Sequence, residues 1–309
     1  MVPPWSRPLL TLGIVLLLAG CAARLAATGQ GPEPAAEPKV SGASSAAVAA
    51  ATLPLDAYVP TDDQMELLNR ARGLLMRDCM RRLGFADWQP PDPRVAHTRP
   101  PLFPFGIVDR QQAALYGYHD PHGPEVVRML RQQPAVSAAE RARQRAELAA
   151  LTGDSAFGRL SGQVPAAGCD GEADRKMRQD APSDDVNLYG TLVDQATQRT
   201  AADTRVAAVN AAWSRCMRRA GFEYQSPQEP GAPEANRWPT PRPTPVEIAT
   251  ARADVACKQK TGLAGVWLGV LAAYERQLIE QHKLALDQVK RELDHQIRKA
   301  NQILEGQRR

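Results

Sequence analysis

Cys79-Met-Arg-Arg-Leu-Gly-Phe85 occurs twice in this chain in closely similar form, the second time as Cys216-Met-Arg-Arg-Ala-Gly-Phe222. Aligned without a gap, the segments 71–90 and 208–227 are identical at 8 of 20 positions. Identity of this extent within one chain indicates an internal duplication, in which each copy is one supersecondary unit. We therefore expect two related units, each built around this motif.

The shared motif has the composition of a helix C-terminus. If Gly84 is the left-handed residue that follows the helix, Met80 and Phe85 occupy the two positions whose side chains touch in a Schellman cap. The adjoining arginines then lie in the last turn, where cations stabilise the negative end of the helix dipole. A catalytic thiol would instead require a free cysteine in an exposed, electropositive environment. We favour the structural interpretation because capping accounts for every residue of the motif.

Four cysteines follow Cys21 in the chain: Cys79, Cys169, Cys216 and Cys257. An even number in an exported chain indicates two disulfides, because the extracytoplasmic compartment is oxidising. A zinc site is disfavoured, since no two of these cysteines form a Cys-x₂-Cys pair. All three possible pairings are compatible with a duplicated chain. We expect Cys79–Cys169 and Cys216–Cys257, because each of these bonds closes within one unit.

The N-terminal residues are typical of a secretory signal. Arg7 precedes an apolar run over 9–18, and the run ends at Leu18-Ala-Gly-Cys21. This ending resembles the bacterial lipobox, in which the cysteine is acylated and becomes the mature N-terminus. The alternatives are a signal anchor, which the short run disfavours because hydrocarbon is about 30 Å thick, and an ordinary signal followed by a chance cysteine. We expect a signal peptide over 1–20 and a palmitoylated Cys21 that anchors the chain at the extracytoplasmic face of the cell membrane.

Composition divides the remainder of the chain. Residues 21–54 are rich in Ala, Gly, Pro and Ser and show no periodicity, so we expect a disordered tether that spans roughly 30 Å. Residues 55–184 should form the first Cys unit, which carries an insertion of about 50 residues relative to the second unit. Residues 185–309 should form the second Cys unit and a long C-terminal helix.

Helix signals fill both units. Capping residues at Thr61, Ser137 and Thr244 predict helix starts, whereas 225–245 holds seven prolines and should be an extended loop. Residues 263–304 contain no proline and predict one rod of about 60 Å. The rod either protrudes as a coiled-coil arm or packs on the units, and packing is the simpler expectation. Nothing alternates with period two for long enough to be a sheet, so the predicted fold is all-α.

The insertion concentrates aromatic, histidine and glycine residues in a chain that is otherwise poor in aromatics. Its centre is Tyr116-Gly-Tyr118-His119-Asp120-Pro-His122. One interpretation makes these side chains a binding site on a recognition loop, or makes the two histidines metal ligands. The other is an irregular loop whose rings cover the edge of a core. We expect no metal, because His-x-x-His without a further ligand is weak evidence for one.

Several functional classes are disfavoured by the composition and motifs. The chain has 38 basic and 34 acidic residues and a net charge of +4, which is not the footprint of a nucleic-acid-binding protein. It contains no phosphate-binding glycine loop, nucleophile elbow, zinc-protease helix or dinucleotide fingerprint. We therefore assign no catalytic residue and expect no cofactor.

Five short stretches together resemble a group of exported actinobacterial proteins. They are Pro54-Leu-Asp-Ala-Tyr58, the Cys-Met with Gly-Phe motif, Tyr116-Gly-Tyr-His119, Trp213-Ser-Arg-Cys216-Met and Ala253-Asp-Val-Ala-Cys257-Lys. Many members of that group are lipoproteins of unknown function. The similarity spans roughly residues 54–290, and the highly charged end beyond 290 departs from it. The resemblance implies an extracytoplasmic, disulfide-linked helical protein and implies no particular activity.

Two functional hypotheses follow from these features. In the first, the chain is a membrane-anchored, extracytoplasmic and non-catalytic lipoprotein whose helical body binds a protein, a peptide or a cell-wall partner. In the second, it is a cell-envelope hydrolase or transferase with a site in the 100–125 insertion. A pocket lined by His119, Asp120 and His122 would favour the enzyme, whereas packing of these side chains against the body would favour the binding protein.

Overall fold

The computed structural model describes residues 37–39, 52–93, 105–121, 137–156, 164–181, 187–232, 238–240 and 242–307. The chain divides after residue 37, and all elements below belong to the part 38–309. The expected signal peptide, Cys21 and most of the expected tether lie outside the described residues, and so does His122.

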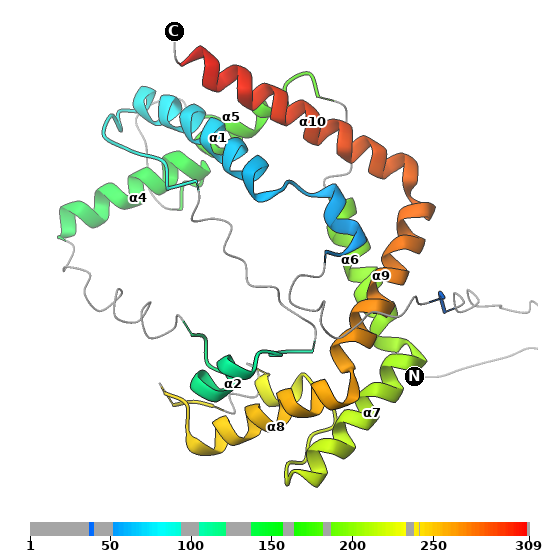
Figure 1. The fold of residues 1–309 in the computed structure, drawn as a ribbon. Helices are drawn as coiled ribbons and strands as arrows, with labels where there is room; N and C mark the ends of the chain where they lie inside the picture. The colour runs from blue at the N-terminus through cyan, green and yellow to red at the C-terminus, as the bar shows by residue number, and fades with distance from the viewer. Residues whose placement is uncertain are drawn as a thin grey trace, which may run out of the picture. The chain divides into compact units, whose positions relative to one another are not determined.

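Every regular element within these ranges is a helix, which confirms the predicted all-α fold (Figure 1). No helix in the described part of the chain is long and apolar enough to cross a membrane. In chain order the elements are the 3₁₀ helix η2 (Pro54–Tyr58), α1 (Asp62–Arg82), α2 (Arg110–Tyr116), α4 (Ala138–Thr152), α5 (Gly168–Met177), α6 (Leu188–Ala202), α7 (Thr204–Arg219), the 3₁₀ helix η4 (Glu229–Gly231), α8 (Pro245–Thr261), α9 (Leu263–Gln281) and α10 (Lys283–Gly306).

The first unit is closed by a disulfide between α1 and α5. Cys79 near the end of α1 is bonded to Cys169 at the start of α5, with the Cα atoms 5.5 Å apart. Helix α4 packs against both helices, and this contact buries Ala150 together with the two cysteines and Met80. The bond therefore lies in a small apolar core that three helices share.

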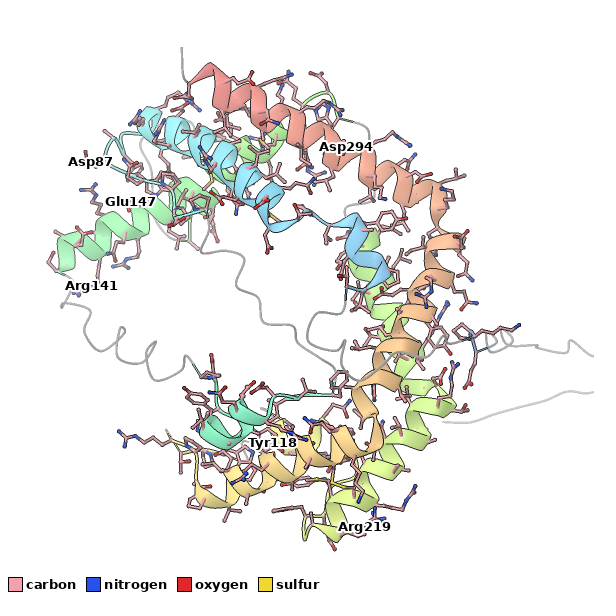
Figure 2. The ribbon with its side chains drawn as sticks, viewed as in Figure 1. Asp87, Tyr118, Arg141, Glu147, Arg219 and Asp294 are labelled. Atoms are coloured by element: carbon pink, nitrogen blue, oxygen red, sulfur yellow. A yellow bond between two sulfur atoms is a disulfide. The ribbon has the colours of Figure 1, made fainter. Side chains whose placement is uncertain are left out.

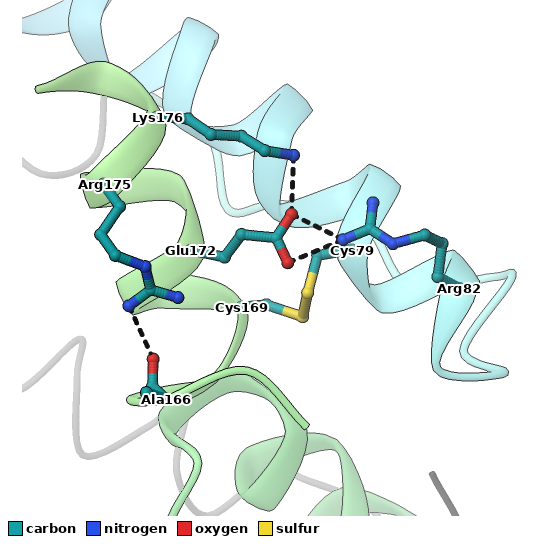
Figure 3. The surroundings of a disulfide bond; sticks show 7 residues. All are labelled: Cys79, Arg82, Ala166, Cys169, Glu172, Arg175 and Lys176. Atoms are coloured by element: carbon teal, nitrogen blue, oxygen red, sulfur yellow. Dashed lines mark hydrogen bonds and ion pairs between the residues drawn. A yellow bond between two sulfur atoms is a disulfide. The ribbon is translucent and has the colours of Figure 1, made fainter. Parts of the chain in front are cut away.

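An ion-pair cluster lies beside this disulfide (Figure 3). The carboxylate of Glu172 on α5 accepts a hydrogen bond from Arg82 on α1 at 2.6 Å and pairs with Lys176 at 2.6 Å. Partial burial opposes ionisation of this carboxylate, but the hydrogen bonds from Lys176 and Arg82 outweigh it and lower the pKa of Glu172. The cluster thus adds a second, polar link between the two helices that the disulfide joins.

The second unit repeats this design around a larger core. Cys216 near the end of α7 is bonded to Cys257 of α8, with the Cα atoms 5.7 Å apart. Residues of α6, α7 and α9 supply most of the surrounding apolar core, in which the Trp213 side chain is fully buried. Each disulfide joins two residues within one unit, so the expected pairing is confirmed.

Both copies of the motif end in Schellman caps, as the sequence predicts. In the first copy the Phe85 amide donates to the Met80 carbonyl at 2.9 Å, and in the second copy the Phe222 amide donates to the Met217 carbonyl at 3.0 Å. The glycine before each phenylalanine has a positive φ, 93° at Gly84 and 90° in the second copy. The repeated motif is therefore a paired helix end and disulfide.

The predicted long C-terminal helix is present as α10, but the prediction that residues 263–304 form one continuous rod is wrong. The helix breaks at His282, whose φ of −113° and ψ of 21° end α9 and begin α10. The two helices serve mainly different cores: α9 packs on α6 and α7, whereas most of α10 packs on α1 and α5 and only its beginning, at Leu286, still belongs to the core of α9. One straight helix would have to serve both cores, and the break lets each apolar stripe face its own. Of the two alternatives for the C-terminal segment, the structure shows packing on the body.

The last helix of the chain links the two Cys units. Helix α10 follows the second unit in the sequence but packs against helices of the first. Leu293 and Ala300 of α10 lie in a cluster with Leu68 and Met177, which belong to α1 and α5. The first unit is thus completed by the last helix of the chain.

The caps predict a specific pattern of stability changes. Phe85→Ala and Phe222→Ala should each lower the free energy of unfolding by up to about 3 kcal/mol, because both rings are half-buried against a core. Gly84→Val should cost about 1–2 kcal/mol from backbone conformation alone, since no atom lies within 4 Å of the position that a Cβ would take there. Thermal unfolding measures both effects.

Asn at position 84 is the matched control for the valine variant, because Asn tolerates positive φ better than a β-branched residue does. Gly84→Asn should unfold at a temperature closer to that of the wild type. Equal melting temperatures for the wild type and the valine variant would show that the glycine does not act as a cap.

Candidate functional site

The described part of the insertion, residues 105–121, lies along α8. Phe105 is fully buried, and its ring centroid lies 6.2 Å from that of Trp267 in the second core. Helix α2 packs on α8 through a small cluster in which Ala113 contacts Ala251 and Val255. Figure 2 shows Tyr118, which follows α2, beside α8. The segment is therefore docked on the second unit along its length.

A buried aspartate of α8 fixes one side of this segment. Asp254 is fully buried and accepts hydrogen bonds from Trp213 Nε1 at 2.9 Å, Lys258 Nζ at 2.8 Å and the Tyr118 hydroxyl at 3.1 Å. Lys258 Nζ also donates to the Ile107 carbonyl at 3.0 Å. Burial raises the pKa of Asp254 and lowers that of Lys258, and the ion pair between them opposes both shifts. These hydrogen bonds join α8 to α7 and to the segment 105–121.

A second buried acid, Glu247, holds the backbone that follows α2. Its side chain is fully buried, and its Oε1 accepts from the Tyr118 amide at 2.8 Å. The approach is so close that a Cβ on Gly117 would lie 2.6 Å from this oxygen, and the φ of Gly117 is +58°. A residue with a side chain would therefore displace the carboxylate, which explains the glycine between the two tyrosines.

His119 is engaged on both sides of its ring. Nδ1 lies 2.7 Å from Glu247 Oε1, and Nε2 lies 2.6 Å from the carbonyl oxygen of Thr240. Two acceptors are best satisfied by a doubly protonated ring. The hydrogen bond to Thr240 raises the pKa of His119 most, Glu247 raises it further, and partial burial opposes both. In this arrangement neither nitrogen is available to ligate a metal or to accept a proton from a substrate.

Tyr116, Tyr118 and Asp120, the other candidates within the described part of the insertion, have different surroundings. The Tyr118 ring stacks on Trp238 at a centroid distance of 5.9 Å, and its pKa is raised by burial and by Asp254. Tyr116 is half-buried and Asp120 is exposed. Among the residues that the structure describes, no three His, Cys, Asp or Glu side chains are grouped as metal ligands.

A groove in the first unit was not predicted from the sequence. It is half-open, has a volume of about 330 Å³ and is lined by side chains of η2, α1, α5 and α10. Its apolar wall consists of Tyr58, Met65, Leu68, Met177 and Leu293, among others. Volumes of this order are at the lower end of the range for small-ligand sites.

Docking of η2 positions the aromatic wall of this groove. The buried Leu55 donates its amide to Glu275 Oε2 at 3.0 Å, and burial, helped by the nearby charge of Asp56, raises the pKa of Glu275 to about 7. Tyr58 follows Leu55 by three residues, and the Nζ atom of Lys290 on α10 lies 4.6 Å from the centre of its ring. This contact fixes the ring against α10.

The groove contains a buried acid with an unused oxygen. Glu292 of α10 is 2 % exposed, and its Oε1 accepts from Gln296 Nε2 at 2.7 Å and from Arg178 at 3.3 Å. Its Oε2 is buried and has no hydrogen-bond partner. Leaving a buried polar atom unpaired costs free energy, so native proteins contain few of them.

A second residue that lines the groove, Arg72, also has a buried atom without a partner. Arg72 of α1 pairs through its terminal nitrogen with Asp170 at 2.9 Å and Asp174 at 3.2 Å. Its Nε is buried and has no hydrogen-bond partner. Two of the residues that line the groove, on two different helices, thus each hold a buried polar atom without a hydrogen-bond partner.

One sequence signal could have pointed to Glu292. In α10 the apolar stripe runs through Leu286, Val289, Leu293 and Ala300, and Glu292 lies on this stripe three positions after Val289. A carboxylate on the buried face of an amphipathic helix is unusual and commonly has a specific partner. The other walls come from distant parts of the chain, which no pattern connects.

Comparison of the chain with protein-family models, curated proteins and solved structures finds no match.

The His119 contacts predict a pH-dependent attachment of residues 105–121. Because the folded-state pKa of His119 is raised, its stabilising contribution is complete below the unfolded value of about 6.5 and is lost as the pH rises through the folded value. Amide exchange in this segment, corrected for the chemical rate, should therefore accelerate as the pH is raised above 6.5.

His119→Gln should remove this pH dependence, while His295→Gln on α10 serves as the control and should retain it. Exchange that is independent of pH in the wild type would show that the contacts of His119 do not attach the segment.

Proposed function

We propose that this protein is a membrane-anchored, extracytoplasmic lipoprotein whose helical body binds a partner without catalysing a reaction. The observation that carries the proposal is the groove between α1, α5 and α10, whose wall is largely apolar. The size of the groove fits a short segment of a partner.

Sequence features support the anchored location. The run that ends in Leu18-Ala-Gly-Cys21 resembles a lipobox, and acylation of Cys21 with two or three chains would make release from the membrane negligible. The two disulfides are of the kind that persists in an oxidising compartment. A tether over 21–54 would place the helical body away from the lipid surface, where a partner can reach the groove.

The packing of the insertion gives less support to the alternative, an envelope hydrolase or transferase. A general base must be within reach of a substrate proton, and both ring nitrogens of His119 already face protein oxygens. Asp254 likewise has three hydrogen-bond donors around it. These residues explain how the segment is attached to α8.

Photo-crosslinking in intact cells tests the proposal. A benzophenone amino acid in place of Met65, which lines the groove, should form adducts with a partner. The same amino acid in place of Asp63, which is exposed on the same helix and outside the groove, should not. The adducts should sediment with membranes, and Cys21→Ser should remain as unprocessed precursor.

Two results would count against the proposal. Adducts of equal yield at both positions, or none at Met65, would show that the groove does not bind a partner. Normal processing of Cys21→Ser to a soluble form would show that the protein is not anchored by this residue.

A further inference from the structure

We propose that protonation of Glu275 controls the docking of η2: the neutral side chain holds η2 on α9, and its ionisation releases η2 together with the aromatic wall of the groove. The inference rests on the proposed function, because it names how binding at the same groove is regulated. It follows from the missing counter-charge of Glu275, from its contact with η2 and from the place of Tyr58 in the groove.

Glu275 differs from the other buried acids in having no basic partner. Within the described part of the chain, five carboxylates are buried. Four of them pair with a basic side chain: Asp203 with Arg205 at 2.6 Å, Glu247 with His119 at 2.7 Å, Asp254 with Lys258 at 2.8 Å and Glu292 with Arg178 at 3.3 Å. Glu275 is 2 % exposed, and the described residues provide it with no such partner. A buried carboxyl without a counter-charge is more stable in its neutral, protonated form.

The charged groups around Glu275 do not replace this partner. Burial raises the pKa of Glu275 most, the hydrogen bond from Leu55 lowers it, the charge of Asp56 on η2 raises it and that of Arg276 on α9 lowers it, so that the pKa is about 7. The other helices that pack on α9 are α6, α7, α8 and α10, and no charged side chain in their described residues contributes to this pKa. Proton release from Glu275 therefore falls close to neutral pH.

A single hydrogen bond joins this side chain to η2. The Leu55 amide donates to Glu275 Oε2 at 3.0 Å, and the Leu55 side chain is buried in the second core. A protonated carboxyl keeps this bond, because its carbonyl oxygen still accepts. An ionised carboxylate is left out of water with one donor and no cation, which costs free energy. Release of η2, which contacts this carboxylate, lets water reach it and removes that cost.

Release of η2 also changes the groove. Tyr58 is the last residue of η2, and its ring lines the groove opposite apolar side chains of α1, α5 and α10. The contact of the ring with Lys290 Nζ at 4.6 Å is lost with it. The groove therefore has its aromatic wall only while Glu275 is protonated.

The direction of the pH dependence follows from proton linkage. The pKa of Glu275 is raised from 4.5 to about 7 when η2 is docked, so docking is accompanied by uptake of a proton. Its stabilising effect is complete below pH 4.5 and is lost as the pH rises to about 7. Between pH 5 and pH 8 the equilibrium constant for docking should fall by up to about a hundredfold.

Amide exchange at Leu55 in the full mature protein tests this directly. Corrected for the chemical rate, exchange should accelerate by at least about tenfold between pH 5 and pH 8, since it reports the opening of η2. In Glu275→Gln the side-chain oxygen accepts the same hydrogen bond but cannot ionise, so exchange at Leu55 should be independent of pH. Glu280→Gln, an exposed position of the same helix, is the matched control and should behave as the wild type.

A second measurement needs no variant. The carboxyl carbon of Glu275 in the wild-type protein, labelled with ¹³C glutamate and assigned through its own side-chain carbons, should titrate with a midpoint near 7. A midpoint at or below 4.5 would overturn the inference, and so would exchange at Leu55 that does not depend on pH in the wild type. Acceleration of equal size in Glu275→Gln would also overturn it.

The effect on the groove is measured with the photo-crosslinker at Met65 in isolated membranes. Adduct yield should fall between pH 5 and pH 8, and it should stay constant when Glu275→Gln is added. An unchanged yield without this substitution would overturn the control of the groove, and an equal fall with and without it would assign the pH dependence to the partner. The proposed function is judged separately, because it falls only if Met65 gives no specific adduct at any pH.

Discussion

The Cys79–Cys169 bond, together with the helix cap beside it, is the constraint on which the groove depends. The bond holds the C-terminal end of α1 against the start of α5, and the ion pairs of Arg72 with α5 follow from that alignment. Helix α10 then packs across both helices. Because α10 comes from the far end of the chain, a surface for it exists only once α1 and α5 are held side by side. The same combination of cap and disulfide orders α7 and α8 in the second unit.

Buried acids perform a second task, which is to attach irregular segments to helices. Glu247 and Asp254 hold the segment after α2, and Glu275 holds η2 through the Leu55 amide. Each of these carboxylates has donors from the segment that it fixes, which offset the cost of burying it. Glu292 is also buried, but one of its oxygens has no partner in the structure. Glu292 therefore differs from the other three in that its burial is only partly compensated by donors.

Local signals predicted much of the fold. Short-range patterns predict the caps of α1 and α7 and the helix starts at Ser137 and Thr244. The repeat predicts the pairing of the disulfides. The break at His282 does not, because no proline or glycine marks it and only the position of two separate cores requires it. The candidate site was predicted less well: Tyr118 and His119 stand out by residue type, but their partners lie more than 100 residues away. The groove combines four distant segments, so no local pattern could reveal it.

The measurement that tests the central claim most directly is non-reducing peptide mapping of the mature protein isolated from its native envelope. Free thiols are alkylated before digestion, and the linked peptides are identified by mass spectrometry. If each repeated unit is closed by its own bond, only Cys79–Cys169 and Cys216–Cys257 peptides will be recovered, without alkylated cysteine. A Cys79–Cys216 peptide, or free thiols at these positions, would contradict the duplicated architecture and with it the alignment of α1 and α5 that forms the groove.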